Sequence, residues 1–297
     1  VEMSGKVENL LKTSLFHCGK PQKCGAEGKT MTSDNVILVA GGDLRQQYAA
    51  RRLRQKTGAD VRTLGLPAQS GLHSAETLEE VPAYDVLVLP VPASPDGTTV
   101  PAPFGKAALP LETLAAHGKP GALVLGGACG GILPWLESRG LAAADYLRRE
   151  ELCLANAVPS AEGAIQIAME ETARTLHGTA ALVIGYGRIG MALAPRLRGL
   201  GMDVTVCARR CETRALAEMQ GFAAVPMEQL PAAAKAAPVI FNTVPALVLD
   251  ETVLKVLPQE TLVIDLASRP GGTDFEAAKR LRTRVVWALS LPPEMRR

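Results

Sequence analysis

The stretch Ala180-Ala-Leu-Val-Ile-Gly-Tyr-Gly-Arg-Ile-Gly190 decides the fold of this chain. An apolar run typical of a strand ends in three glycines at GxGxxG spacing, and a helical pattern follows. Gly185 permits a tight turn, Gly187 has no Cβ to keep a pyrophosphate away, and Gly190 lets the helix pack closely on the sheet. The helix N-terminus then offers free N–H groups to an anion. The stretch predicts a dinucleotide-binding βα unit, with cofactor contacts at Gly185, Tyr186, Gly187, Arg188, Ile189 and Gly190.

The end of the next predicted strand, 203–207, bears on the choice of nicotinamide cofactor. NAD is usually held by an Asp or Glu about twenty residues past the first glycines, through the ribose hydroxyls. Here the strand is followed by Arg209 and Arg210, with no acid beside them. Because guanidinium groups suit a phosphate, we expect NADP. NAD stays possible, since the arginines could also begin a solvent-exposed helix.

Length and composition favour a two-domain α/β protein. The chain has 297 residues, of which 47% are hydrophobic and only 4% aromatic. That is long enough for two ordinary domains with aliphatic helix-on-sheet packing. The formal charge of +2, without a basic stripe, argues against a nucleic-acid partner.

The cysteines and the N-terminal residues bear on compartment and metals. Six cysteines lack CxxC spacing, which favours reduced thiols. His17, Cys18 and Cys24 are too few for a four-ligand metal site, so we expect no metal. With no membrane-length apolar run and no signal-peptide pattern, we expect a cytoplasmic protein without a membrane partner.

Strand and helix patterns alternate along the chain, which favours parallel sheets covered on both faces. The fold class predicted is α/β, with two doubly wound, Rossmann-like domains and an interdomain cleft. Strands are expected at 36–40, 60–64, 85–89, 121–125, 151–155, 180–184, 203–207, 238–242, 261–265 and 284–288, and helices at 44–57, 133–139, 142–150 and 164–177. The predicted divisions are an N-terminal extension or disordered tail (1–33), a substrate-side domain (34–158), a connector helix (159–177), an NAD(P)-binding domain (178–290) and a short, truncated C-terminus (291–297).

Several further motifs carry a resemblance to a known family. They are Gly41-Gly-Asp-Leu-Arg-Gln46, Leu89-Pro-Val-Pro92, Asn156-Ala-Val-Pro-Ser-Ala-Glu-Gly163, Asn242-Thr-Val-Pro245 and Asp265-Leu-Ala-Ser-Arg-Pro-Gly-Gly-Thr-Asp-Phe275. Together with the glycine motif they resemble the A subunit of dipicolinate synthase over about residues 35–290. The chain departs from that family after Pro292, where a further loop and helix would be expected.

The resemblance implies an NAD(P)-dependent dehydrogenase of endospore formers that works with a flavoprotein-like B subunit. Its substrate would be a small dicarboxylate, a dihydrodipicolinate or 4-hydroxytetrahydrodipicolinate precursor, oxidised to pyridine-2,6-dicarboxylate for sporulation. The resemblance also implies the cytoplasm of the mother cell. We further expect a homo-oligomer.

Candidate catalytic residues follow from what a dicarboxylate needs, which is fixed cations and backbone donors. Arg45 lies just past the first strand, where open α/β sheets place ligands, and Asp43 would orient it or take part in proton transfer. A helix cap at Asp43 with a solvated Arg45 is the alternative. Arg269 is a second carboxylate candidate, unless it pairs with Asp274.

The loop and connector supply the remaining candidates. Ser160 is expected to cap the connector helix and Glu162 to lie in its first turn, and both would also face the cleft. The resemblance places Asn242-Thr243-Val244-Pro245 beside the nicotinamide ribose. Asp265 ends the next strand, and the loop that contains Ser268, Arg269, Gly271 and Gly272 would approach the nicotinamide or the substrate. Asp265, Ala267 and Ser268 are the expected cofactor contacts there.

Two other functions stay open at this point. One is a dehydrogenase that acts on another small carboxylic acid. A 2-hydroxy acid is disfavoured as its substrate, because no histidine stands in a catalytic motif. The other is a non-catalytic, nucleotide-binding partner of the B subunit, since glycine motifs report binding and not turnover.

Overall fold

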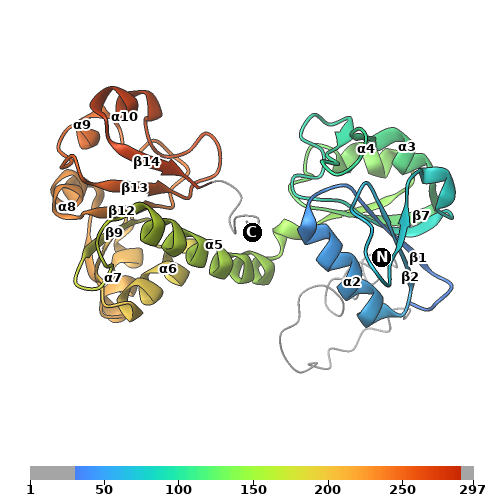
Figure 1. Cartoon of the computed structure of the whole chain (residues 1–297), viewed down its shortest axis with the longest axis horizontal. Coiled ribbons are helices and arrows are strands. Elements are labelled where there is room, and N and C mark those ends of the chain that lie inside the picture. Colours follow the sequence, from blue (N-terminus) through green and yellow to red (C-terminus); the bar gives the residue numbers. More distant parts are fainter. Residues whose placement is uncertain (1–30, 289–297) are drawn as a thin grey trace. The chain divides into compact units, whose positions relative to one another are not determined.

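The computed structural model describes residues 31–288, and these divide into two compact units between Leu152 and Cys153. Each unit contains a six-stranded, wholly parallel sheet (Figure 1). The predicted α/β class with two doubly wound sheets is therefore confirmed. The predicted truncated C-terminus lies outside the described residues, as does all but the end of the predicted N-terminal extension.

The first unit has the strand order β3-β2-β1-β4-β7-β8. Its strands are β1 (Val36–Ala40), β2 (Asp60–Leu64), β3 (His73–Ala75), β4 (Tyr84–Val88), β7 (Gly118–Gly126) and β8 (Ala142–Asp145), and a separate antiparallel pair is formed by β5 (Thr99–Val100) and β6 (Leu109–Pro110). Its helices are α2 (Leu44–Thr57), α3 (Leu111–Ala116) and α4 (Leu133–Ser138). Because the order reverses between β1 and β4, the loops after those strands form the natural ligand edge.

The second unit has the order β11-β10-β9-β12-β13-β14, the usual arrangement of a dinucleotide-binding sheet. Its strands are β9 (Ala180–Ile184), β10 (Asp203–Cys207), β11 (Ala223–Val225), β12 (Val239–Asn242), β13 (Leu262–Asp265) and β14 (Arg284–Trp287). Its helices are α5 (Glu150–Glu171, begun before the unit boundary), α6 (Arg188–Gly199), α7 (Cys211–Met219), α8 (Leu230–Ala236), α9 (Glu251–Leu254) and α10 (Phe275–Leu281). The order reverses between β9 and β12.

Both faces of the second sheet are covered, which explains its continuous apolar strands. Successive residues of a strand point to opposite faces. Val183 and Phe241 pack with α5 and α6, whereas Leu182 and Ile240 pack with α8 to α10. The first unit is layered in the same way, with α3 and α4 on one face and α2 on the other.

Three predicted elements near the unit boundary are wrong. The helix expected at 142–150 is strand β8, followed by the 3-10 turn Tyr146–Arg148. The strand expected at 151–155 and the loop expected at 156–163 are both part of α5. The connector helix expected over 159–177 thus starts earlier and ends at Glu171. Pairing with β7 overrides the helical preference of the alanines at 142–144.

Candidate functional site

The glycine loop between β9 and α6 has the geometry that a bound pyrophosphate requires. Gly185 has a φ of +89°, and an added Cβ would lie 2.5 Å from Thr243 Oγ1. At Gly190 an added Cβ would lie 2.3 Å from Gly185 O, so only glycine allows this close helix packing. Gly187 differs, because its Cβ would meet nothing within 4 Å. It caps the N-terminus of α6, and the approach to that helix end is open.

The other residues of the glycine motif divide between the core and the surface. Tyr186 is 5% exposed, its hydroxyl pairs with Gln220, and its ring packs edge-on against Phe222 at 6.1 Å between centroids. Burial raises the pKa of its hydroxyl. Ile189 packs against the same core, whereas Arg188 is exposed as the first residue of α6. Tyr186 therefore anchors the glycine loop to the core of the second unit.

Arg209 and Arg210 follow β10, and both are exposed. Because β9 and β10 are parallel neighbours, both strands end at the same edge of the sheet. The two guanidiniums thus belong to the edge that carries the glycine loop. Arg214 on α7 stabilises the turn after β10, because its Nη1 donates to Ala208 O and Arg209 O, both at 2.9 Å.

A buried polar network joins the ends of β12 and β13. Asp265 is wholly buried and accepts four hydrogen bonds, from Asn242 Nδ2 (3.0 Å), Ala267 N (3.0 Å), Gly272 N (2.9 Å) and Thr273 Oγ1 (2.8 Å). Asn242 Oδ1 in turn accepts from Val244 N. These contacts fix the loops that follow β12 and β13. Asp265 and Asn242 therefore shape the carboxyl edge of the second sheet through buried hydrogen bonds.

Four further candidates lie at the same edge of the second sheet. Thr243 donates from its backbone N–H and from its hydroxyl to Ile184 O, each at 2.9 Å, which ties the β12 loop to the end of β9. Ala267 O accepts from Trp287 Nε1 at 3.1 Å. Ser268 is exposed on the loop that follows β13, and Pro245 is exposed on the loop that follows β12. Sequence reasoning placed Gly272 in this loop but missed Thr273, which stands in the same quoted Asp265 segment.

Arg269 lies over the ring of Trp287, with 5.5 Å between its Cζ and the ring centroid. The alternative ion pair with Asp274 is not formed within the described residues. Asp274 instead caps α10 by accepting a hydrogen bond from Ala277 N. Within the described residues, the Arg269 guanidinium thus makes a cation–π contact with Trp287 and no ion pair with Asp274.

In the first unit, Asp43 and Arg45 form one paired group beside the end of β1. Asp43 caps α2 by accepting from Arg45 N at 2.9 Å, and it also binds the Arg45 guanidinium at 2.6–3.0 Å. Burial raises the pKa of Asp43, but hydrogen bonds from Arg45 and its charge outweigh this and hold that pKa below its ordinary value. Asp43 therefore both caps α2 and pairs with the Arg45 guanidinium.

Sequence reasoning missed two further residues at the carboxyl edge of the first sheet. Asp145 ends β8 and accepts from Ala128 N, Cys129 N and Leu147 N, which shapes the loop after β7. Gln46 is buried and donates to Leu89 O at 2.9 Å, the carbonyl that also accepts from Tyr146. The signal for Asp145, an acid at the end of a strand, was hidden by the wrong helix at 142–150.

Ser160 and Glu162 do not lie at a helix start, and that prediction is wrong. Both stand inside α5, which begins at Glu150. The Ser160 hydroxyl donates to Asn156 O at 2.9 Å, one turn back along the helix. Glu162 is exposed and lies 3.9 Å from Arg196 Nε on α6. Both contacts join or support helices of the second unit.

Cysteines and acids offer no alternative reaction centre in the described residues. Burial and the charge of Asp145 raise the pKa of Cys129 to about 11, so its thiol stays protonated at neutral pH. Within residues 31–288, no group of three or more His, Cys, Asp or Glu is arranged to hold a metal ion. His17, Cys18 and Cys24 lie outside these residues. No helix in the same part of the chain could cross a membrane.

Comparisons with known proteins agree with the division of the chain into two units. Residues 36–147 match the family described as the N-terminal domain of the dipicolinate synthase A subunit. Residues 155–268 match the family described as D-isomer specific 2-hydroxyacid dehydrogenase, NAD binding domain. The two matches correspond to the two units, and the second contains the glycine loop.

Individual relatives point to the same family. The dipicolinate synthase A subunit of Bacillus subtilis (strain 168) is 31% identical over 265 residues, covering 86% of this chain and 88% of that protein. The crystal structure of the dipicolinate synthase A subunit from Bacillus halodurans matches with a TM-score of 0.78 at 28% identity, over 87% of this chain and 90% of that one. The crystal structure of the Bacillus subtilis protein matches with a TM-score of 0.77, also at 28% identity, over 87% and 89%. The chain is an NAD(P)-dependent oxidoreductase and belongs to the family of dipicolinate synthase A subunits.

Proposed function

We propose that this chain is the dehydrogenase subunit that oxidises a dihydrodipicolinate or 4-hydroxytetrahydrodipicolinate precursor to pyridine-2,6-dicarboxylate with NADP. The observation that carries the proposal is the open approach to Gly187 at the N-terminus of α6. In a chain of this family, it marks where a dinucleotide pyrophosphate would be held. Family membership supports the substrate class.

The residues at the edge of the second sheet fit a dinucleotide. Gly185, Gly187 and Gly190 would cradle the pyrophosphate, and Arg209 and Arg210 would bind the 2′-phosphate of NADP. Thr243, Val244 and Ser268 would border the nicotinamide half. When bound, the oxidised nicotinamide supplies a hydride acceptor.

Arg45 and Arg269 are the residues we propose for the substrate carboxylates. Each carries its guanidinium at the carboxyl edge of its own sheet, Arg45 paired with Asp43 and Arg269 over Trp287. A guanidinium matches the fork geometry of a carboxylate, and such contacts orient the ring.

Asp43 acts by orienting Arg45 in this proposal. Its lowered pKa keeps it ionised at neutral pH and makes it a weak base, because proton transfer is most efficient for a group whose pKa lies near the operating pH. The demand on a base is small, since loss of a hydride to NADP⁺ and of a proton to water from a dihydropyridine ring gives an aromatic product. The 4-hydroxytetrahydrodipicolinate precursor must first lose its 4-hydroxyl and a ring hydrogen as water, which gives that dihydropyridine. Ser160 and Glu162 support the fold of α5 and its contact with α6.

The setting proposed with this activity is the cytoplasm of a sporulating mother cell. The partners would be further copies of this chain and a flavoprotein-like B subunit. The name of the Bacillus subtilis relative, which designates it a subunit, supports a complex.

The test is a coupled observation of cofactor and product. Freshly generated 4-hydroxytetrahydrodipicolinate and NADP⁺ are mixed with the chain, with and without the B subunit, and NADPH and pyridine-2,6-dicarboxylate are followed by absorbance. The proposal expects both signals to rise together, and comparing the mixtures shows whether the B subunit is needed. If neither absorbance rises while calorimetry still detects NADPH binding, the chain is not a dehydrogenase of this substrate, and a nucleotide-binding role is favoured instead.

A further inference from the structure

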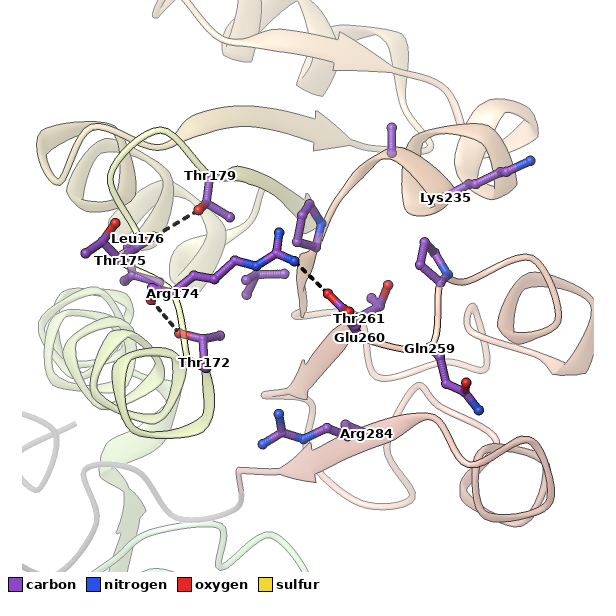
Figure 2. Close-up of a pocket in the computed structure, with 15 residues that line it drawn as sticks. Thr172, Arg174, Thr175, Leu176, Thr179, Lys235, Gln259, Glu260, Thr261 and Arg284 are labelled. Carbon is purple, nitrogen blue, oxygen red and sulfur yellow. Dashed lines mark hydrogen bonds and ion pairs between the residues drawn. The ribbon is translucent and has the colours of Figure 1, made fainter.

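A pocket lies at the amino ends of the strands in the second unit, at the edge opposite to the glycine loop. It has a volume of about 630 Å³, within the range of small-molecule sites. Its walls come from the chain that enters β9, β12, β13 and β14 (Figure 2). Thr261 precedes β13 and Asp265 ends it, so the two edges are roughly 13 Å apart along that strand.

Positive charge and apolar surface dominate the lining. Arg174, Lys235 and Arg284 contribute three cations and Glu260 one acid, and Arg284 Nη2 pairs with Glu171, just outside the lining, at 2.7 Å. Alanine, leucine, valine and proline side chains form most of the rest. Within residues 31–288, the Lys235 ammonium has no hydrogen-bond or ion-pair partner. The lining therefore suits a small organic anion with an apolar body.

Thr261 supplies the most specific feature of the pocket. It is 1% exposed, and within the described part of the chain its hydroxyl has no hydrogen-bond partner. The neighbouring threonines differ, because Thr172 donates to Ala168 O at 2.7 Å and Thr179 donates to Thr175 O at 2.9 Å. A buried hydroxyl without a partner is costly, and it is an unused donor beside a cationic group.

An exposed ion pair stands beside this hydroxyl. Arg174 Nη2 lies 2.6 Å from Glu260 Oε2, and Figure 2 shows Arg174 reaching across toward Glu260 and Thr261. The two side chains are 68% and 80% exposed, so their pairing contributes little free energy and is readily exchanged. A ligand carboxylate or phosphate can therefore replace Glu260 on Arg174.

We propose that this pocket is a second ligand site, which binds a small organic oxyanion through Arg174 and the Thr261 hydroxyl. The anion takes the place of the Glu260 carboxylate and accepts the hydrogen bond that Thr261 leaves unused. Its apolar body packs on the proline and alanine surface, and the Lys235 ammonium adds a further positive charge, whereas Arg284 is paired with Glu171. The site does not rest on the proposed dehydrogenase activity.

The test is calorimetry on the full chain without cofactor, with three probes. Citrate represents a carboxylate, phenyl phosphate a phosphate with an apolar body, and inorganic phosphate the charge alone. Arg174→Gln and Thr261→Val should each weaken binding of citrate or phenyl phosphate by roughly ten- to a hundredfold, since each removes a hydrogen bond to a charged group. Inorganic phosphate should bind more weakly than phenyl phosphate.

Two control variants separate this site from loss of folding and from the glycine loop. Thr63→Val removes a buried, partnered hydroxyl from the first unit, and Arg139→Gln removes an ion-paired arginine there. Both should leave probe binding unchanged. Thr261→Val should unfold at the same temperature as the wild type or higher, because it removes an unpaired polar group.

Either of two results would overturn the proposal. One is that neither citrate nor phenyl phosphate binds. The other is binding that Arg174→Gln and Thr261→Val leave unchanged, which would place the anion elsewhere, for example at the N-terminus of α6. Neither result bears on NADPH formation, so the proposed function stands or falls separately.

Discussion

Asn242 and Asp265 are register partners on the neighbouring strands β12 and β13, and Asn242 Nδ2 donates a 3.0 Å hydrogen bond to Asp265 Oδ1. Both residues are fully buried where the strands end. Each also holds the loop that follows its own strand, through Val244 N and Gly272 N. One pair of side chains thus fixes the two loops that follow β12 and β13, at the edge of the sheet that carries the glycine loop.

Asp265→Asn should lower both stability and cofactor affinity. An amide in place of the carboxylate directs an NH₂ group at buried donors, so we expect a loss of about 3 kcal/mol in the free energy of unfolding. Urea unfolding measures this loss, and NADPH titration measures the affinity. Asp250→Asn is the control, because Asp250 is an exposed cap that accepts from Val253 N. A D265N free energy equal to that of D250N would contradict the role of the network.

Gly187→Ala and Gly190→Ala should separate binding from folding. Alanine at Gly187 meets open space at a φ of −93°, so the free energy of unfolding should change by about 0.5 kcal/mol or less. The new methyl would crowd the pyrophosphate and weaken NADPH binding roughly tenfold or more.

Gly190→Ala should behave in the opposite way. Its methyl would lie 2.3 Å from Gly185 O, which costs about 1–3 kcal/mol of stability before any cofactor is added. Thermal unfolding and NADPH titration of both variants give the comparison. If G187A binds NADPH as tightly as the wild type, the pyrophosphate does not approach Gly187.

Arg209→Gln and Arg210→Gln should shift preference from NADP toward NAD. Each variant removes a charge-assisted hydrogen bond to the 2′-phosphate, so NADPH affinity should fall roughly ten- to a hundredfold while NADH affinity hardly changes. Titration with both cofactors gives the ratio. Arg52→Gln is a matched exposed control on α2 in the other unit. An unchanged ratio in both variants would favour an NAD enzyme whose arginines are only solvated.

The sequence predicted the first strand of each sheet because the signals for these strands are local. Val36–Ala40 and Ala180–Ile184 are continuous apolar runs bounded by polar or glycine residues, and both form strands as expected. The glycine positions followed from sterics alone. In contrast, the Asp265 network joins residues from two strands, and no spacing in the sequence reveals which donors a buried carboxylate will meet.

The errors around α5 have a clear physical origin. Glu151-Leu-Cys-Leu-Ala155 is a short apolar run after one acid, which resembles a buried strand, and Pro159 suggested a loop because proline removes a helical hydrogen bond. The helix nevertheless runs through Pro159, and Ala161, Ala164 and Ala168 of its later turns are wholly buried in the core of the second unit. Tertiary packing outweighed the local signal, and the cap expected at Ser160 was lost with it.

Asp43→Asn should change both the acid stability and the substrate KM. The folded pKa of Asp43 lies below the unfolded value, so its charge stabilises the fold at pH values above the unfolded pKa. That contribution is lost as the pH falls below 3.8 and through the folded pKa. Because asparagine caps a helix about as well as aspartate, D43N should lose mainly the ion pair with Arg45. At neutral pH it should therefore be about 0.5 kcal/mol less stable, and the difference should vanish in acid.

The activity of the same variant tests the link to Arg45. Without the carboxylate that holds its guanidinium, Arg45 should bind a dicarboxylate less well, so KM should rise more than kcat falls. Asp60→Asn is the control, because Asp60 also has a lowered pKa and pairs with Arg62 but stands at the amino end of β2. D60N should share the acid-dependent stability change and keep the wild-type KM. A D43N enzyme that loses stability with no change in KM would reduce Asp43 to a helix cap.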